Sequence, residues 1–254
     1  MNKSILTLTV TAFLAAHAQA ASLLTDDFNS YPDGSLVGAP GSPWIHYSGT
    51  TPGQVDVVSG QLSISRSETE DVTADLNGGP ATIGSGTSLY TSFTVSFSAL
   101  PSAAGNYFAH LRNSTNGFRD RIWASTTGAA AGDFRLGVGN GSAADANSGQ
   151  LPADLSLNTT YLVVTRYDVD AGLSTIWLNP TAETDPGGVT AIDPTAATDI
   201  FSFNFRQDTS MGIMSVDDLK VGTTFGEVVA VPEPSTLALL VLGAVGLLAR
   251  RFRR

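Results

Sequence analysis

The chain has 254 residues, of which 42% are hydrophobic and 14% are charged, so it is long enough to bury a core of its own. Its formal net charge of −10 argues against a nucleic-acid-binding protein, because binding to phosphates needs clustered lysine and arginine. Cysteine is absent, which excludes disulfides, thiolate metal sites and cysteine nucleophiles.

The first twenty residues contain the three parts of a secretory signal peptide. Lys3 gives a positive start, residues 5–16 form an apolar run, and Ala18-Gln19-Ala20 provides a cleavage site of small residues. We expect signal peptidase to cleave after Ala20. The alternative is a short buried N-terminal helix, whereas a membrane span would need a longer apolar run.

The region from residue 21 to residue 229 predicts one all-β domain. Short runs of alternating apolar and polar residues are separated by turn residues at intervals of about 8–12 residues, as in a β-sandwich. The clearest alternation runs from Leu89 to Phe97, and Phe201, Phe203 and Phe205 repeat it. Further strands are expected at 54–59, 61–65, 107–112, 118–125, 134–138, 161–168, 173–179 and 211–221, and only residues 226–231 resemble a linker.

Few residues of this domain suit catalysis. Retaining glycoside hydrolases need two carboxyl groups about 5–5.5 Å apart. The nearest pattern is Glu68-Thr69-Glu70-Asp71, which we interpret as a solvated acidic turn. Only His46 and His110 remain beyond the signal peptide, and no Gly-x-Ser-x-Gly motif is present. We therefore expect no catalytic residues and predict that the protein is not an enzyme.

A group of polar and aromatic side chains on the expected strands is a candidate ligand surface. Ligand sites combine aromatic walls with a few placed polar groups, so an extracellular polysaccharide is a candidate partner. The alternative is that the arginines of this group pair with Asp120, Asp133, Asp168 and Asp170, while the tryptophans fill the core. The candidate residues are His110, Arg112, Arg121, Trp123 and Trp177, within a wider group that also contains Arg119, Arg166 and Arg206.

The last two dozen residues combine three features in a fixed order. Pro232-Glu233-Pro234 is followed by an uncharged, mostly apolar run at 237–249 and by four arginines among residues 250–254. As a helix the run would cover about 20 Å, which is short of a hydrocarbon core of about 30 Å. The arginines are expected to stay on the cytoplasmic side of the membrane, which places the domain on the outer side.

These features resemble the PEP-CTERM sorting signal of Gram-negative bacteria, over residues 230–254. The resemblance implies recognition by exosortase, an integral-membrane cysteine protease, and cleavage near Pro232, Glu233 and Pro234. The C-terminal helix would then hold the protein in the membrane only before processing, and the mature protein would reach the cell surface or the extracellular matrix. The alternative is a plain tail anchor that the protein retains.

The two ends of the domain resemble concanavalin A/LamG-like domains of PEP-CTERM proteins. The segment Asp26–Leu36 with Trp44 is similar to their first strand and loop, and Ser215–Gly222 is similar to their last strand. The resemblance implies a jelly-roll sandwich of two antiparallel sheets in which the chain ends lie on neighbouring strands.

The same resemblance implies a structural calcium ion. Asp217 of the final strand and Gly60 match the positions that hold it, and Asp26 or Asp27 would contribute from the opening strand. Calcium prefers six to eight oxygen ligands, which aspartates and backbone carbonyls supply. The alternative is that Asp217 and its neighbour only hydrogen-bond to loop amides.

The predicted function is that of an exported, non-catalytic protein of the cell surface or extracellular matrix. It would be structural or bind glycans weakly. The alternative is a divergent polysaccharide hydrolase or lyase on the same fold.

Overall fold

The computed structural model describes residues 22–78, 83–141 and 149–229. The predicted signal peptide at 1–20 and the predicted sorting signal at 230–254, including Pro232, Glu233 and Pro234, lie outside these ranges. Within the described ranges, no helix is long and apolar enough to cross a membrane.

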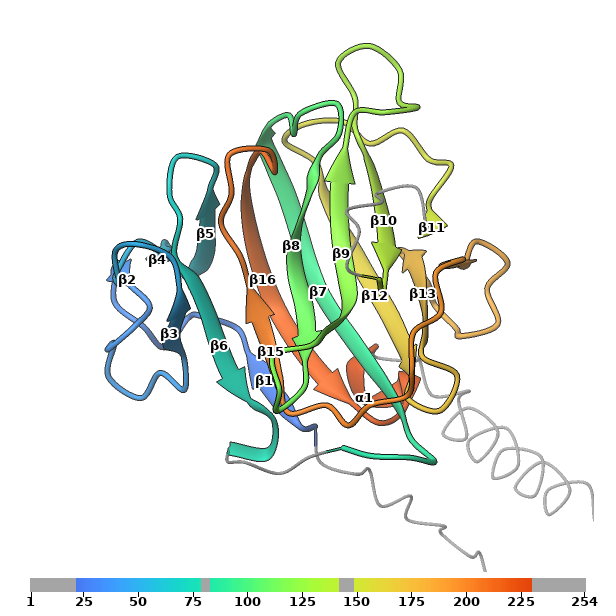
Figure 1. Cartoon of the computed structure of the whole chain (residues 1–254). Coiled ribbons are helices and arrows are strands. Elements are labelled where there is room, and N and C mark those ends of the chain that lie inside the picture. The colour runs from blue at the N-terminus through green and yellow to red at the C-terminus, as the bar shows by residue number, and fades with distance from the viewer. Residues whose placement is uncertain (1–21, 79–82, 142–148, 230–254) are drawn as a thin grey trace, which may run out of the picture.

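The described chain forms a jelly-roll sandwich of two antiparallel sheets (Figure 1). Sheet A has nine strands, in the order β14-β13-β12-β7-β16-β5-β4-β2, with β1 paired to β16. They are β1 (Leu24–Asp26), β2 (Gly34–Ser35), β4 (Asp56–Val58), β5 (Gln61–Ser65), β7 (Ser88–Ala99), β12 (Thr160–Asp168), β13 (Leu173–Leu178), β14 (Val189–Thr190) and β16 (Ile213–Gly222).

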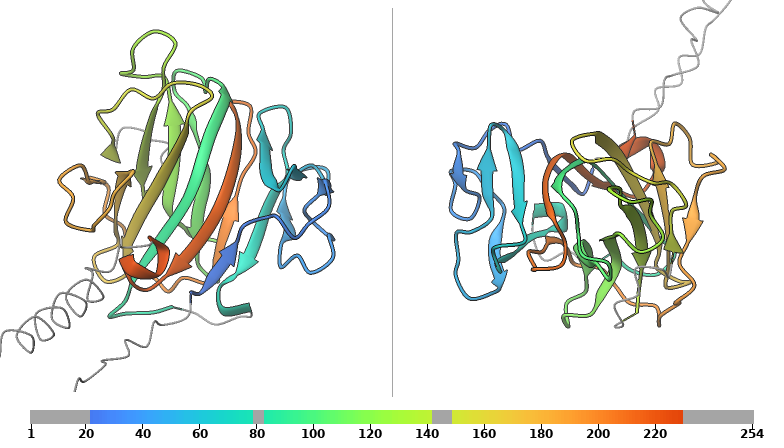
Figure 2. Two further views of the ribbon diagram at one scale, coloured as in Figure 1. Left: turned by 180° about the vertical axis from the view of Figure 1, so that it is seen from behind. Right: turned by 90° about the horizontal axis from the view of Figure 1, so that it is seen from above.

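Sheet B has seven strands, in the order β11-β10-β9-β8-β15-β6-β3. It faces the viewer in Figure 1, and sheet A faces the viewer in the left panel of Figure 2. The strands of sheet B are β3 (Ile45–Ser48), β6 (Asp71–Asp75), β8 (Asn106–Arg112), β9 (Phe118–Ser125), β10 (Arg135–Gly139), β11 (Gly149–Gln150) and β15 (Ser202–Phe205).

Alternation along the strands decides which side chains enter the core, and it confirms the predicted all-β fold. In β7, Leu89, Phe93 and Phe97 are fully buried between the sheets, whereas Thr94 and Ser96 lie on the outer face. Each outward position on a strand is therefore fixed by the packing of its two neighbours.

Aromatic pairs join the two sheets. The ring centroids of Phe93 and Phe108 are 6.0 Å apart, and those of Phe97 and Phe134 are 4.3 Å apart. Such pairs contribute about 0.5–1.5 kcal/mol each beyond the area that they bury. These contacts hold the two sheets in a fixed position relative to each other, and they thereby fix the positions of the outer faces.

Both ends of the described domain lie on sheet A. Leu24 of β1 pairs with Val221 of β16, which confirms that the chain ends meet on neighbouring strands. The short helix α1 (Phe225–Val228) then packs on the outer face of sheet A against Tyr90 and Val164 (Figure 2). The predicted linker at 226–231 is therefore wrong for residues 226–229, which are docked on the sheet.

Candidate functional site

Three arginines lie on the outer face of sheet B. Arg112 ends β8, Arg121 lies in β9, and Arg206 directly follows β15. Their neighbours Leu111 and Ile122 are fully buried in the core, so the arginine side chains must point away from it. We call Arg112, Arg121 and Arg206 the arginine cluster.

Each guanidinium group of the arginine cluster lies over an aromatic ring. Cation–π contacts of this kind contribute about 0.5–2 kcal/mol, depending on how far the pair is removed from water. They also hold the planar guanidinium groups in place on the sheet. The distances from guanidinium carbon to ring centroid are 4.4 Å for Arg112 over Tyr47, 4.5 Å for Arg206 over Tyr107, and 5.2 and 5.3 Å for Arg121 over Tyr107 and Phe118.

His110 lies beneath the cluster and has no exposed surface. Its ring centroid is 5.4 Å from that of Tyr107 and 4.3 Å from that of Phe118. Burial lowers the pKa of His110 well below its usual value, and the charges of the arginine cluster lower it further. The imidazole is therefore neutral at pH 7, and neither of its nitrogens has a hydrogen-bond partner among the described residues.

Further hydrogen-bond donors around His110 lack acceptors. They are Nε of Arg121, Nη1 of Arg206 and Nδ2 of Asn204, none of which has a partner in the described chain. Asn204 lies directly opposite His110 in the register of β15 and β8. A buried donor without an acceptor costs about 1–3 kcal/mol, so this arrangement suits a ligand that brings acceptor oxygens.

The two tryptophans of the predicted ligand surface do not lie together. Trp123 is on the outer face of sheet B, where its ring centroid is 5.3 Å from that of Tyr107, but it is only 1% exposed. Trp177 is opposite Val164 on the outer face of sheet A, only 5% exposed and closely packed against Gly188. Neither indole offers a ring face to solvent, so the predicted grouping is corrected. His110, Arg112, Arg121 and Trp123 share one face, and Trp177 belongs to the other sheet.

The alternative pairing of arginines with four aspartates is also corrected. Within the described ranges, none of Asp120, Asp133, Asp168 and Asp170 forms an ion pair with an arginine. Asp120 instead lies between the sheets, where it accepts a hydrogen bond from Thr165. The arginine ion pairs that form are Arg135–Asp154 at 2.6 Å, Arg166–Glu183 at 2.8 Å and Arg206–Asp208 at 3.0 Å.

A second candidate site lies where β5 and β1 meet along β16. Val216 of β16 pairs with β5, and Leu219 pairs with β1. Asp217 and Asp218 lie between these pairings, at an irregularity in the register of β16 against β7. Gly60 precedes β5 and Asp27 follows β1, so the topology brings the predicted calcium residues to one junction.

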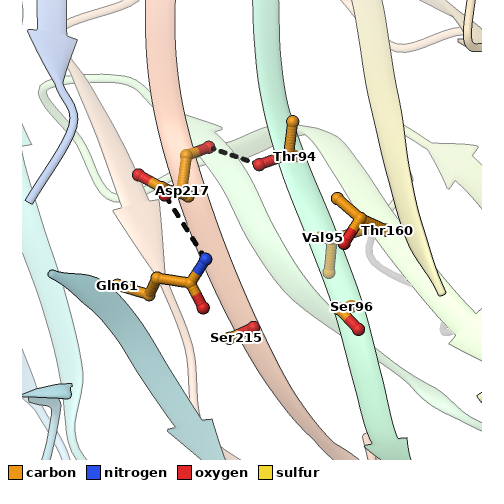
Figure 3. Close-up of a pocket in the computed structure, with 7 residues that line it drawn as sticks. All are labelled: Gln61, Thr94, Val95, Ser96, Thr160, Ser215 and Asp217. Carbon is orange, nitrogen blue, oxygen red and sulfur yellow. Dashed lines mark hydrogen bonds between the residues drawn. The ribbon is translucent and has the colours of Figure 1, made fainter. Parts of the chain in front are cut away.

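Asp217 borders a small groove of about 150 Å³ on the outer face of sheet A (Figure 3). Its Oδ2 accepts a long hydrogen bond of 3.4 Å from Gln61. Burial raises the pKa of the Asp217 carboxyl, and the negative charges of Asp218 and Asp27 act in the same direction. The residues that line the groove are Gln61, Thr94, Val95, Ser96, Thr160, Ser215 and Asp217.

The junction fits a calcium ion only in part. Gly60 has φ +76° and a Cβ there would collide with Oδ1 of Asn29, which places a side-chain amide oxygen beside the junction. Asp26 is not available, because its carboxylate accepts hydrogen bonds from Trp44 Nε1 at 2.7 Å and the Tyr31 hydroxyl at 2.8 Å. In the described part of the chain, no three histidine, aspartate or glutamate side chains are grouped closely enough to hold a metal. A calcium ion here would depend on amide and backbone oxygens.

The predicted solvated acidic turn is wrong for Glu70. This side chain has no exposed surface, and its carboxylate accepts hydrogen bonds from the backbone amides of Gly53, Gln54 and Val55 at 2.6–2.9 Å. Burial alone would raise the pKa of Glu70, but these bonds and the contact with His46 lower it below its usual value. Glu70 therefore fixes the loop before β4.

Four residues of the site on sheet B escape sequence analysis: Tyr47, Tyr107, Phe118 and Asn204. Simple alternation places Phe118 and Arg121 on opposite faces, but both lie beside His110. The register of β8 against β9 shifts between Ala109 and Leu111, which accommodates extra residues in β9. No residue type in the sequence signals this bulge.

The C-terminal segment identifies how the protein is sorted within the cell. Residues 230–254 match the family model of the PEP-CTERM protein-sorting motif. The PEP-CTERM motif implies an exported, surface-associated protein that exosortase processes. No curated protein matches the chain.

Solved structures with similar folds have low sequence identity to this chain. A sialidase is 14% identical with a TM-score of 0.48, and the match covers 82% of this chain but only 19% of the sialidase. The PL7 alginate lyase AlyA1 from Zobellia galactanivorans is 16% identical with a TM-score of 0.46, covering 77% of this chain and 96% of the lyase. The carbohydrate recognition domain of Emp46p is 11% identical with a TM-score of 0.45, covering 79% and 99%.

Proposed function

We propose that this chain is an exported, non-catalytic protein of the cell surface or extracellular matrix, sorted by exosortase, whose concanavalin A/LamG-like domain binds glycans weakly. The observation that carries the glycan part is the arginine cluster on the outer face of sheet B. Three planar cations stack over rings there, beside buried donors without acceptors in the described chain. Aromatic rings with a few placed polar groups are the usual means of holding a small ligand.

The environment of the titratable groups supports binding without turnover. A general base must come within hydrogen-bond distance of the proton that it removes, and His110 has no exposed surface. Burial raises the pKa of Tyr107, which keeps its hydroxyl protonated at neutral pH. The carboxylate of Glu70 is occupied by backbone donors. The alternative function, a polysaccharide hydrolase or lyase, would need a general base other than His110, Tyr107 or Glu70.

A binding and turnover assay separates the two functions. Mature protein recovered from the producing cells is applied to a panel of immobilised polysaccharides, and the same mixtures are assayed for new reducing ends and for unsaturated products. We expect retention on at least one polysaccharide with no product. Product release that Arg206→Gln abolishes would instead establish the enzyme.

Processing is tested on the same mature protein by intact-mass measurement. We expect an N-terminus at Ala21, which is lost when signal peptidase is inhibited, and a C-terminus near Pro232-Glu233-Pro234, which is lost when the exosortase gene is deleted. A mature chain that still ends at Arg254 would show that the tail is a retained anchor.

We also propose that the junction of β1, β5 and β16 binds a structural calcium ion. Support comes from the convergence of Asp217, Asp218 and Asp27 at this junction, where a cation would relieve their mutual repulsion. Added calcium is expected to raise the melting temperature, EDTA to lower it, and Asp217→Asn to remove the response. Asp133→Asn, which lies in the loop before β10 of the other sheet, is the matched control. Superimposable melting curves with calcium and with EDTA would exclude the site.

A further inference from the structure

We infer that the glycan is anionic, and that the arginine cluster of sheet B binds carboxylate groups of a uronic-acid polysaccharide. This inference rests on the glycan-binding function proposed above and names the class of ligand. It is carried by the charge on this face, by the unused donors of the guanidinium groups and by two buried donors beneath them.

The first argument is the placement of positive charge. Residues 21–230 contain 8 basic and 22 acidic side chains, a net charge of −14. Three of those few cations nevertheless gather over one aromatic surface, close enough that all three lower the pKa of the same histidine. A protein that repels polyanions almost everywhere thus presents one cationic patch.

The three carboxylates near this patch are all engaged by donors of the protein itself. Asp208 pairs with Arg206 at 3.0 Å. The Asp193 carboxylate accepts hydrogen bonds from the backbone amides of Asn140 and Gly141 at 2.9 and 2.6 Å. Asp71 accepts hydrogen bonds from the Ser48 hydroxyl at 2.6 Å and the Gln207 amide at 3.2 Å. Asp208 is thus in an ion pair with Arg206, while Asp193 and Asp71, which lie close enough to interact electrostatically with Arg121 and Arg206, are also held by amide or hydroxyl donors.

The second argument is that the guanidinium groups of Arg206 and Arg121 are only partly used, whereas all three nitrogens of Arg112 donate hydrogen bonds within the chain. Arg206 bonds to Asp208 through Nη2, and its Nη1 has no partner in the described chain. Arg121 donates from Nη1 to the carbonyl of Gly141, and its Nε has no partner there either. A planar guanidinium matches a carboxylate through two parallel hydrogen bonds, which a sugar hydroxyl does not provide.

The third argument is the pair of buried donors beneath the cluster. Asn204 and His110 have no exposed surface, and Nδ2 of Asn204 and both ring nitrogens of His110 have no partner within the described residues. They lie opposite each other across β15 and β8, the two strands that position Arg206 and Arg112. Neither side chain reaches the surface, and the neutral imidazole has one donor and one acceptor nitrogen, so this pair places two N–H donors below an anion without contacting it directly.

The inference is tested with polymers that differ only in charge. Polygalacturonate is compared with the same polymer after chemical reduction of its carboxyl groups, and dextran sulfate is compared with dextran. We expect the mature protein to bind polygalacturonate at least about tenfold more tightly than the reduced polymer, which is the effect of one charge-assisted hydrogen bond. The affinity is expected to fall as sodium chloride rises from about 0.05 to about 0.3 M, because screening weakens contacts at a partly exposed face.

Substitutions then locate the site. Arg206→Gln and Arg112→Gln are expected to weaken binding of polygalacturonate about tenfold. Two substitutions serve as controls. Arg166→Gln removes a cation from the outer face of sheet A, and Arg135→Gln removes a cation that forms an ion pair with Asp154. Both variants are expected to bind polygalacturonate as tightly as the wild type. Asp208→Asn releases Arg206 from its internal partner and is expected to tighten binding severalfold. A purely structural role of Arg206 predicts no such gain.

Each outcome separates the class of ligand from the function itself. Equal binding of polygalacturonate and its reduced form would overturn the anionic ligand while leaving glycan binding intact. If the protein binds none of the four polymers and no polysaccharide in a wider panel, the glycan-binding function is refuted as well. A preference for dextran sulfate over polygalacturonate would exclude the carboxylate. An equal loss in Arg166→Gln would show that only overall charge matters and would remove the site.

Discussion

Two buried carboxyl groups, Asp120 and Glu70, show how the surroundings of a residue decide its role. Asp120 has one hydrogen-bonded oxygen, while its Oδ1 has no partner in the described chain. Glu70 receives three backbone donors. Burial disfavours the charged form of both, but only Glu70 has enough donors to reverse that effect. We therefore expect the two groups to make the stability of the fold depend on pH in opposite directions.

For Asp120, burial raises the pKa from 3.8 to about 6, and the hydrogen bond from Thr165 offsets this only in part. The folded state binds the proton more tightly than the unfolded chain, so this stabilisation is complete below pH 3.8 and is lost as the pH rises through about 6. Asp120→Asn is expected to be more stable than the wild type at pH 7, by up to about 3 kcal/mol at about 1.4 kcal/mol per pKa unit. Urea unfolding at several pH values measures the difference, which should disappear near pH 4. A constant difference across that range would contradict the assignment.

Glu70→Gln is expected to show the opposite trend. The lowered pKa of Glu70 contributes stability that is present above its usual value of 4.5 and is lost as the pH falls through the lowered pKa. Loss of the charged acceptor should destabilise the fold at pH 7 by about 2–4 kcal/mol, because at least one of the three backbone amides loses its acceptor and the acceptor that remains is uncharged. Glu68→Gln is the control, because this half-buried neighbour accepts a hydrogen bond from the Gln54 side chain rather than from the backbone amides of the loop. Equal unfolding free energies of the wild type and Glu70→Gln at pH 7 would show that the loop does not depend on this anchor.

At the scale of elements, the sequence predicts strands where alternation is long and unbroken. The predicted ranges 61–65 and 118–125 agree with β5 and β9. The strand β6 was missed because Asp71 and Asp75 at its ends obscure the inward-facing Val72 and Ala74. Short, mixed strands of this kind are fixed by their neighbours in the sheet rather than by their own pattern.

The site was less predictable than the fold. Alternation placed Arg121 and Trp123 on one face, but it could not show that Trp177 lies on the other sheet, because that depends on how strands are distributed between layers. The bulge in β9, where Asp120 has φ +50°, brings Phe118 to His110 against the simple alternation. Contacts that depend on sheet order and on bulges are long-range properties and leave no local signal.

The docked helix α1 provides a prediction at this scale. Phe225 meets Tyr90 edge-on at 6.4 Å, and the Ser92 hydroxyl donates to the carbonyl of Val228 at 2.7 Å. Phe225→Ala removes most of the apolar contact of a four-residue helix, which cannot persist alone in water. Hydrogen exchange is expected to accelerate at residues 223–229 with little change in β8 or β9. Acceleration throughout the sandwich, or none at all, would contradict local docking.

On the scale of the whole molecule, the sandwich separates two surfaces. The outer face of sheet A is partly covered by α1 and carries the groove beside Asp217. The outer face of sheet B carries the arginine cluster over its aromatic rings. The rigid aromatic core between the sheets keeps these surfaces apart. A glycan that uses the arginine cluster therefore leaves the groove and α1 uncovered.

The most direct test is a crystal structure of the mature protein with a galacturonate oligosaccharide. We predict electron density for the sugar across β8, β9 and β15, with a carboxylate oxygen within hydrogen-bond distance of the guanidinium group of Arg206 or Arg121. Density along β7 and β16 of sheet A, with the arginine cluster unoccupied, would contradict this prediction.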